Sequence, residues 1–238
     1  MKLSKRLETV ASMVTKGNRA ADVGCDHGFV PIFLVESGIS PLAVAADVRS
    51  GPLSRAKEHI KEHRLEEKIQ TRLSDGLANI KPGEADSLIM SGIGGILMMR
   101  LLQDEEHTAK SFKELILSPQ SELFDVRRYL VSNGYLIEYE HMLCDEGKFY
   151  FIFHVLVKKD EREWSEEEYR YGKDICKDDM KTFLAYLEKE ERQYEQILEK
   201  MKQAPENDRA VQRIAQLHQD ITCLKKRRQL VYDCGCFA

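Results

Sequence analysis

The chain has 238 residues, 42% hydrophobic and 32% charged, which is enough for one large domain, or one domain with an appendage, around a sizeable core. Its 36 basic and 40 acidic residues give a formal net charge of −4, which excludes the bulk basic character of many nucleic-acid-binding proteins. Any RNA contact must then be a local patch. The N-terminal segment MKLSKRLETV has no apolar signal core, and no run of about 18 apolar residues follows, so we expect a cytoplasmic protein without membrane attachment.

The six cysteines predict no metal site. They are scattered, without a C-x-x-C pair or clustered Cys/His spacing: Cys25, Cys144, Cys176, Cys223, Cys234 and Cys236. We interpret them as reduced, mostly structural thiols. The pair Cys234 and Cys236 near the C-terminus lacks two further ligands nearby, so we assign it no function.

A helix is expected first, because apolar residues between Leu3 and Val14 recur at helical spacing. The segment from Arg19 to Leu34, RAADVGCDHGFVPIFL, then reads as a short apolar strand, a glycine turn and an apolar helix. Such a turn lets backbone amides approach a ligand closely. In a dinucleotide-binding turn the second glycine lies under the pyrophosphate, but here Asp26 takes that place. A carboxylate there would repel a pyrophosphate and suits a ligand with an ammonium group.

The spacing D-x-G-x-D-x-G, formed by Asp22, Gly24, Asp26 and Gly28, resembles motif I of the class I S-adenosylmethionine-dependent methyltransferases. The cofactor of that class carries an amino acid end, a sulfonium and a ribose but no phosphate. Any glycine-rich turn between a strand and a helix offers the same outline, so the turn alone leaves both interpretations open.

The second strand, Leu42 to Ala46, ends in Asp47, about twenty residues after the glycine turn. An acidic side chain at this place accepts hydrogen bonds from the ribose hydroxyls in nucleotide-binding folds, although an aspartate that only caps a loop is the alternative. A helix from Ser50 to Leu65 and a strand from Ile69 to Leu73 follow. The next turn carries Asp75 and Gly76, and resemblance to the methyltransferases places Asp75 near the adenine amino group.

The fourth strand, Ala85 to Met90, leads into Ser91, Gly92, Ile93, Gly94 and Gly95. In the fold that the motif implies, this strand end faces the transferred methyl group. Three glycines among four residues indicate a tight turn or the close approach of a flat group, with a flexible loop as the alternative. A helix continues from Ile96 to Leu102.

The remaining elements of this part are a strand at Phe112–Leu117, a helix at 122–131 and a hairpin of strands 135–143 and 148–158. Alternating strands and helices that end in an antiparallel hairpin predict an α/β fold with a mostly parallel, seven-stranded, Rossmann-like sheet and helices on both faces. This is the class I methyltransferase layout.

The composition changes from Trp164 onward, where glycine is nearly absent and apolar residues repeat at intervals of three and four. A break at Pro205–Asp208 predicts two antiparallel helices in a coiled-coil-like hairpin. We therefore expect a methyltransferase domain over residues 1–160 and a helical coiled-coil domain over 161–238. The run from Lys225 through Arg227 to Arg228 would bind phosphates or form a solvated helix end.

Taken together, the chain resembles the bacterial tRNA (adenine-22-N1)-methyltransferases, which join a class I catalytic domain to a C-terminal coiled coil. The resemblance is carried by LSKRL at Leu3–Leu7, the DVGCDHG turn with Pro31 and Ile32, SDGL at Ser74–Leu77 and SGIGG at Ser91–Gly95. The chain departs from the family at Phe29, where a tyrosine is common, and at Ser118, Pro119 and Gln120, where Q-P-N is frequent.

The resemblance implies that S-adenosylmethionine donates a methyl group to N1 of adenine 22, in the D-arm region of tRNA. The residues that we expect to take part fall into three groups. Asp26, Ser91 and Gly94 are assigned as catalytic. Cofactor binding is assigned to Asp22, Gly24, Asp26, Gly28, Asp47, Asp75, Gly76, Ser91 and Gly92. Contacts with the RNA are assigned to Arg6, Phe29, Gly94, Gly95, Lys225 and Arg227.

The interpretation has alternatives. Arg6 would contact RNA, orient the cofactor carboxylate or form only a surface salt bridge. We expect a monomer without a bound metal. Two rival functions remain: a methyltransferase that acts on a small molecule or a protein, and a non-catalytic, cofactor-binding scaffold whose helices bind a partner protein.

Overall fold

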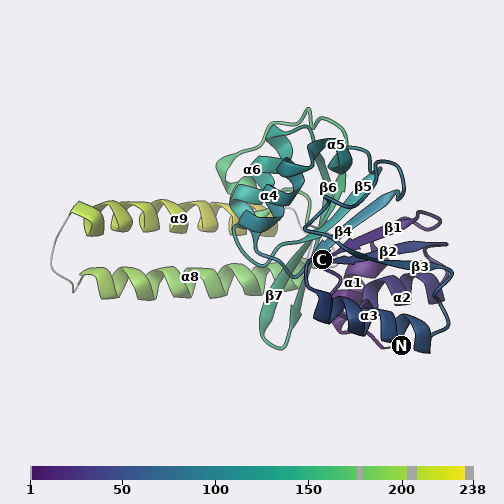
Figure 1. The fold of residues 1–238 in the computed structure, drawn as a ribbon. Coiled ribbons are helices and arrows are strands. Elements are labelled where there is room, and N and C mark those ends of the chain that lie inside the picture. The colour runs from purple at the N-terminus through teal and green to yellow at the C-terminus, as the bar shows by residue number, and fades with distance from the viewer. Residues whose placement is uncertain (1, 176–178, 203–207, 234–238) are drawn as a thin grey trace. The chain divides into compact units, whose positions relative to one another are not determined.

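The computed structural model describes residues 2–175, 179–202 and 208–233. The chain divides into two compact units, Met1–Arg162 and Glu163–Ala238. The first unit is an α/β sandwich and the second is helical (Figure 1). The α/β fold with a mostly parallel seven-stranded sheet and a C-terminal helical region is therefore confirmed. Among the described residues, no helix has the length and apolar character needed to cross a membrane.

The sheet has the strand order β3-β2-β1-β4-β5-β7-β6. Its strands are β1 (Ala20–Val23), β2 (Ala43–Asp47), β3 (Ile69–Leu73), β4 (Ser87–Ser91), β5 (Glu114–Ser118), β6 (Leu136–Asp145) and β7 (Lys148–Leu156). The first five run parallel, and β7 is antiparallel to both of its neighbours. Every residue of β1, β2 and β5 is buried, which explains why these strands are continuous apolar runs rather than alternating ones.

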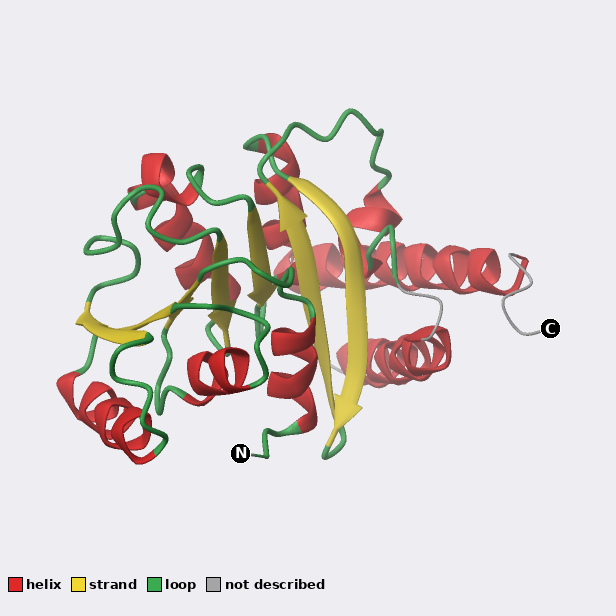
Figure 2. Cartoon of the chain, turned by 90° about the vertical axis from the view of Figure 1, so that its right-hand side faces the viewer, coloured by secondary structure: helices red, strands yellow, loops and turns green. Residues whose placement is uncertain are grey.

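Helices cover both faces of this sheet (Figure 1). One side carries α1 (Lys5–Ser12), α2 (Phe29–Glu36) and α3 (Ser50–Glu62), and the other carries α4 (Gly95–Asp104), α5 (Glu106–Ala109) and α6 (Leu123–Ser132). The long strands β6 and β7 form a curved hairpin at one edge (Figure 2). Glu146 and Gly147 turn it with φ of +48° and +76°, as a two-residue hairpin loop requires.

Element boundaries differ from the predicted ones for local reasons. Helix α1 begins at Lys5 rather than at Leu3, because the Ser4 side chain caps it by accepting from the Leu7 amide. Helix α3 ends at Glu62, and Arg64 adopts a left-handed φ of +58°. The sequence pattern missed two short helices, α5 and α7 (Glu166–Tyr171). A capping box between Ser165 and Glu168 begins α7.

The second unit contains α7, α8 (Met180–Lys202) and α9 (Asp208–Asp233). Glu191, at the midpoint of α8, pairs with Arg228 near the end of α9, whereas Leu198, later in α8, packs on Leu217, earlier in α9. These contacts show that the two long helices run antiparallel. Most of the predicted break, Pro205–Asn207, and the cysteines Cys176, Cys234 and Cys236 lie outside the described residues.

Candidate active site

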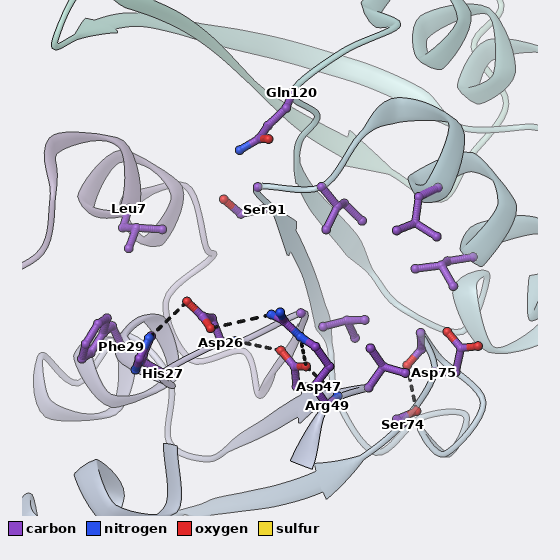
Figure 3. Close-up of a pocket in the computed structure, with 18 of the residues that line it drawn as sticks. Leu7, Asp26, His27, Phe29, Asp47, Arg49, Ser74, Asp75, Ser91 and Gln120 are labelled. Carbon is purple, nitrogen blue, oxygen red and sulfur yellow. Dashed lines mark hydrogen bonds and ion pairs between the residues drawn. The ribbon is translucent and has the colours of Figure 1, made fainter. Parts of the chain in front are cut away.

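The carboxyl ends of strands β1 to β4 surround a cavity of about 430 Å³ (Figure 3). It lies at the switch point between β1 and β4, where open α/β sheets bind their ligands. The structure brings nine of the predicted site residues to its wall: Arg6, Gly24, Asp26, Phe29, Asp47, Asp75, Gly76, Ser91 and Gly92. Asp22, Gly28, Gly94 and Gly95 lie close by in the sequence but do not line it.

Asp47 is the most firmly held carboxylate of the cavity wall. Its side chain is 4% exposed, and its two oxygens accept from the backbone amides of Asp26 at 3.1 Å and Arg49 at 2.9 Å. The Asp26 amide comes from the turn after β1 and the Arg49 amide from the start of α3. The carboxylate is thus oriented by both neighbouring loops before any ligand contact is made.

The turn after β1 has the left-handed backbone that its sequence requires. Gly24, Asp26 and Gly28 have φ of +82°, +49° and +73°. Gly28 serves packing rather than ligand contact, because a Cβ there would lie 3.0 Å from the Cβ of Ala56 on α3. The prediction that Gly28 binds the cofactor therefore gains no support from the cavity wall.

Asp26 stands at the mouth of the cavity with a side chain that is 58% exposed. Its carboxylate lies 3.9 Å from the guanidinium of Arg49 and 3.5 Å from Nε2 of His27 (Figure 3). The Arg49 guanidinium also lies 3.7 Å from Asp47. Because Asp26 and Arg49 are well exposed, water screens this pair and it adds little to stability. The arrangement presents one carboxylate and one exposed cation to an incoming ligand.

Asp22 lies behind the cavity wall in β1, with 4% exposure. Burial and, to a smaller extent, the negative charge of Asp47 raise the pKa of its carboxyl group to about 7, against the opposing effect of the Arg6 charge. Asp22 thus acts on the site through charge rather than through the lining surface.

Arg6 reaches the site from α1. Its guanidinium donates to the Ser91 hydroxyl at the end of β4, and it lies over the Tyr150 ring at 5.5 Å. A Cβ at Gly92 would come within 3.7 Å of the same guanidinium. Arg6 is therefore a part of the cavity wall beside the end of β4, so it does more than form a surface salt bridge.

Gly94 and Gly95 make room for the protein itself. A Cβ at Gly95 would lie 2.5 Å from the Ser121 carbonyl oxygen and 2.8 Å from Val126, and one at Gly94 would lie 3.2 Å from the Ser121 hydroxyl. The absence of side chains here lets the loop before α6 close against the first turn of α4. The hypothesis that both glycines leave space for the substrate ring is not supported by these contacts.

Asp75 and Gly76 lie at the other end of the cavity, beyond β3 (Figure 3). The Ser74 hydroxyl fixes their turn by donating to the Gly76 carbonyl at 2.8 Å and accepting from the Asn79 amide at 3.0 Å. The side chains of Val48, Leu97 and Leu101 add an apolar wall. A flat ring between an apolar wall and a carboxylate suits this end of the site.

Sequence reasoning missed several lining residues: His27, Arg49, Leu97 and Gln120. Arg49 and His27 stand next to predicted residues, and Gln120 is the third residue of the Ser-Pro-Gln segment after β5. The sequence signal that could have identified them is their proximity to strand ends, because residues that follow parallel strands gather at the same edge of the sheet.

Lys225 and Arg227 belong to α9 of the second unit, where acidic and aromatic neighbours engage the basic run. Lys225 lies 3.6 Å from Glu191, and Lys226 pairs with Glu167. Arg227 lies over the Phe183 ring at 5.8 Å and donates to the Lys173 carbonyl. These contacts join α9 to α7 and α8, and the RNA-binding role of Lys225 and Arg227 stays a prediction. No cluster of three potential metal ligands occurs within the described ranges.

The chain matches the family model for a methyltransferase domain over residues 3–153. It is 28% identical to the tRNA (adenine(22)-N(1))-methyltransferase of Bacillus subtilis, over 95% of this chain and 97% of that enzyme. The crystal structure of the B. subtilis m1A22 tRNA methyltransferase superimposes with a TM-score of 0.85, again at 28% identity, over 95% of this chain and 99% of that one.

A Streptococcus pneumoniae protein proposed as a tRNA (m1A22) methyltransferase is 33% identical over 95% of this chain and 100% of its own, with a TM-score of 0.85. The same protein has been solved in complex with S-adenosyl-L-methionine.

The strand order, the glycine turn and the carboxylate at the end of β2 define a Rossmann-like, class I methyltransferase. Within that class, the chain belongs to the tRNA (adenine-22-N1)-methyltransferase family. The resemblance on which the sequence analysis relied is confirmed.

Proposed function

We propose that this chain transfers a methyl group from S-adenosylmethionine to N1 of adenine 22 in tRNA. The observation that carries the proposal is the pairing of two strand ends in one cavity. Asp47 supplies a buried, preoriented carboxylate at the end of β2, and Ser91–Ile93 supply a small, uncharged rim at the end of β4. The first suits a ribose, and the second suits a neutral base beside it.

The residues present fit the methyl donor. A cavity of about 430 Å³ is of the size that small-molecule sites have. Asp47 would accept from the ribose hydroxyls, Asp75 would face the adenine amino group and Asp26 would border the ammonium end.

When bound, S-adenosylmethionine supplies an electrophilic methyl group on its sulfonium. Adenine N1 already carries a lone pair, so the protein has no obligatory proton to remove before attack. The amine-binding D/N-P-P-Y/F element of exocyclic-amine methylases and the nucleophilic cysteine of C5-cytosine methylases are both missing from Ser91–Gly95. Catalysis then consists mainly of positioning, in which the Arg6–Ser91 pair holds the rim of the acceptor side in place.

On the tRNA, adenine 22 in the D-arm region would have to become locally exposed, because its Watson–Crick edge must reach the cavity. Phe29 would flank the base and Arg6 would face it across the cavity. The helices of residues 161–238 would contact the tRNA body, and residues 1–160 would carry the chemistry. We also infer that the protein is a cytoplasmic monomer. The reaction needs no metal, because the methyl group on the sulfonium is already activated for displacement.

The test incubates the purified chain with methyl-labelled S-adenosylmethionine and three acceptors: unmodified tRNA transcripts, a protein extract and a metabolite extract. We expect label only in tRNA, and nuclease digestion should release 1-methyladenosine. Label confined to protein or metabolites would favour another methyltransferase activity. Cofactor binding without transfer to any acceptor would favour a scaffold.

A further inference from the structure

Three aromatic rings stack beside the cavity, and the sequence analysis singled out only one of them. The three rings form a triangle of close neighbours: the Phe29 centroid is 5.3 Å from that of His27, with 11° between the ring planes, and 5.1 Å from that of His59, with 20° between the planes. The His27 and His59 centroids are 5.9 Å apart. We call these three side chains the ring stack.

The ring stack joins two elements at the wall of the cavity. His27 and Phe29 belong to the turn after β1 and the start of α2, and both line the cavity next to Asp26 (Figure 3). His59 belongs to the last turns of α3 and does not line the cavity. It contacts the cavity-lining residues His27 and Phe29 instead.

A hydrogen bond fixes the imidazole of His59. Its Nδ1 lies 3.0 Å from the backbone carbonyl oxygen of His27. A carbonyl oxygen only accepts, so this contact requires a hydrogen on Nδ1 of His59. The bond holds the ring of His59 against Phe29 and ties α3 to the turn that carries Asp26.

All three rings are only partly buried, and the His27 side chain remains 28% exposed. A structural core would enclose such rings, whereas partly open rings at a cavity mouth offer their faces and edges to another flat group. Unstacked RNA bases bind in this way on aromatic side chains.

We propose that His59 is a positioning residue for the RNA substrate: it holds the rings of Phe29 and His27 in the orientation in which they contact the acceptor adenine. The inference rests on the function proposed above and adds a residue on α3 to the acceptor site. His59 itself touches neither the base nor the methyl donor.

The test compares steady-state kinetics on tRNA for the wild type and three variants. His59→Ala removes the ring and the hydrogen bond, His59→Phe keeps a ring, and His59→Asn keeps a donor near the place of Nδ1. The matched control is His63→Ala, at the residue that caps the C-terminus of α3, where the imidazole contacts Glu36 at 2.6 Å instead of the ring stack.

For His59→Ala we expect KM for tRNA to rise by roughly fivefold or more, the lower end of what one base–aromatic stack contributes. Affinity for S-adenosylmethionine, measured by calorimetry, should remain that of the wild type. His59→Phe should recover most of the KM, His59→Asn should recover part of it, and His63→Ala should behave as the wild type.

An unchanged KM in His59→Ala, or an equal rise in His63→Ala, would overturn the inference, as would parallel losses of cofactor affinity and thermal stability. A wild type that methylates no tRNA would overturn the proposed function and this inference with it. The two failures are therefore distinguishable.

Discussion

Asp47 combines a structural and a ligand-binding role in one carboxylate. Its oxygens accept from the amides of Asp26 and Arg49, which lie in two separate loops, while the side chain borders the cavity. The hydrogen bonds remove the freedom of the side chain, so a ribose would meet a carboxylate that is already oriented. Preorganisation of this kind lowers the entropic cost of binding.

Replacing this charge should weaken cofactor binding without unfolding the chain. Asp47→Asn keeps the shape of the side chain but loses a charged acceptor, which contributes about 1.5–3 kcal/mol to a hydrogen bond. We expect calorimetry to show a roughly tenfold to hundredfold loss of affinity for S-adenosylmethionine. The control Asp104→Asn, at a side chain that is 62% exposed on α4, should bind as the wild type. Equal affinities for Asp47→Asn and the control would remove Asp47 from the site.

Asp22 makes the stability of the fold sensitive to pH. Its folded-state pKa, about 7, lies above the ordinary aspartate value of 3.8. Between about pH 4 and pH 7 the folded state keeps a proton that the unfolded state has lost, so the contribution of Asp22 to the free energy of unfolding falls as the pH rises.

We therefore predict that Asp22→Asn gains stability relative to the wild type on going from pH 4 to pH 8. The upper limit of the gain is roughly 4 kcal/mol, because one pKa unit corresponds to about 1.4 kcal/mol. Urea denaturation at several pH values measures it. A difference between the two proteins that does not change with pH would contradict the assignment.

At the scale of elements, Gly95 determines how α4 and the loop before α6 fit together. Gly95→Ala would place a Cβ 2.5 Å from the Ser121 carbonyl oxygen, and the backbone there has no room to yield. Overpacking of this kind costs about 1–3 kcal/mol. We expect urea denaturation to show this loss for Gly95→Ala. The control Gly51→Ala on α3, with nothing within 4 Å of its Cβ, should be neutral or slightly stabilising.

Glu114 lies at the end of the parallel strands that is opposite to the cavity, and it connects several elements there. Its carboxylate accepts from the Thr15 amide at 2.8 Å, from Asn18 at 3.1 Å and from Nε2 of His154 at 3.0 Å, and it also contacts Ser87. Burial would raise its pKa, but the hydrogen bonds from His154, Ser87 and Thr15 outweigh burial and lower the pKa to about 2. The loop after α1 and strands β4, β5 and β7 all depend on this ionised group.

Glu114→Gln should accordingly remove part of the acid sensitivity of the fold. Because the pKa is lower in the folded state, the ionised group stabilises the fold above about pH 4.5, and this contribution disappears as the pH falls toward 2. The wild type should lose roughly 3 kcal/mol more than the variant over that interval. Parallel acid-denaturation curves for the two proteins would show that Glu114 is not ionised in the folded state.

The sequence was sufficient to predict the central strands, because β1, β2, β4 and β5 are mostly apolar runs with turn residues at both ends. It was insufficient where tertiary contacts decide. Gly95 reads as a ligand-binding glycine, yet the carbonyl of Ser121 explains it. His59 reads as one of several polar residues of α3, and its contacts with Phe29 and His27 distinguish it from His63, which contacts Glu36.

For the molecule as a whole, the positions of acidic and small residues relative to the strand ends allowed much of the site to be predicted. Asp47 and Ser91 end β2 and β4, Asp75 follows two residues after β3, and parallel strand ends meet at one edge of the sheet. The basic run of α9 shows the limit of this reasoning. Its charges indicate a phosphate-binding surface, whereas the structure pairs Lys226 with Glu167 and places Arg227 over Phe183.

The proposed activity of this chain is the methylation of one atom of one nucleotide. The most direct measurement incubates the pure protein with S-adenosylmethionine and an unmodified tRNA transcript, and then locates the modified base by arrest of reverse transcription, which a methyl group on N1 blocks. We predict an arrest at adenine 22 that disappears when this base is replaced by guanine. Methylation at another position, or an arrest that persists after the replacement, would contradict the account.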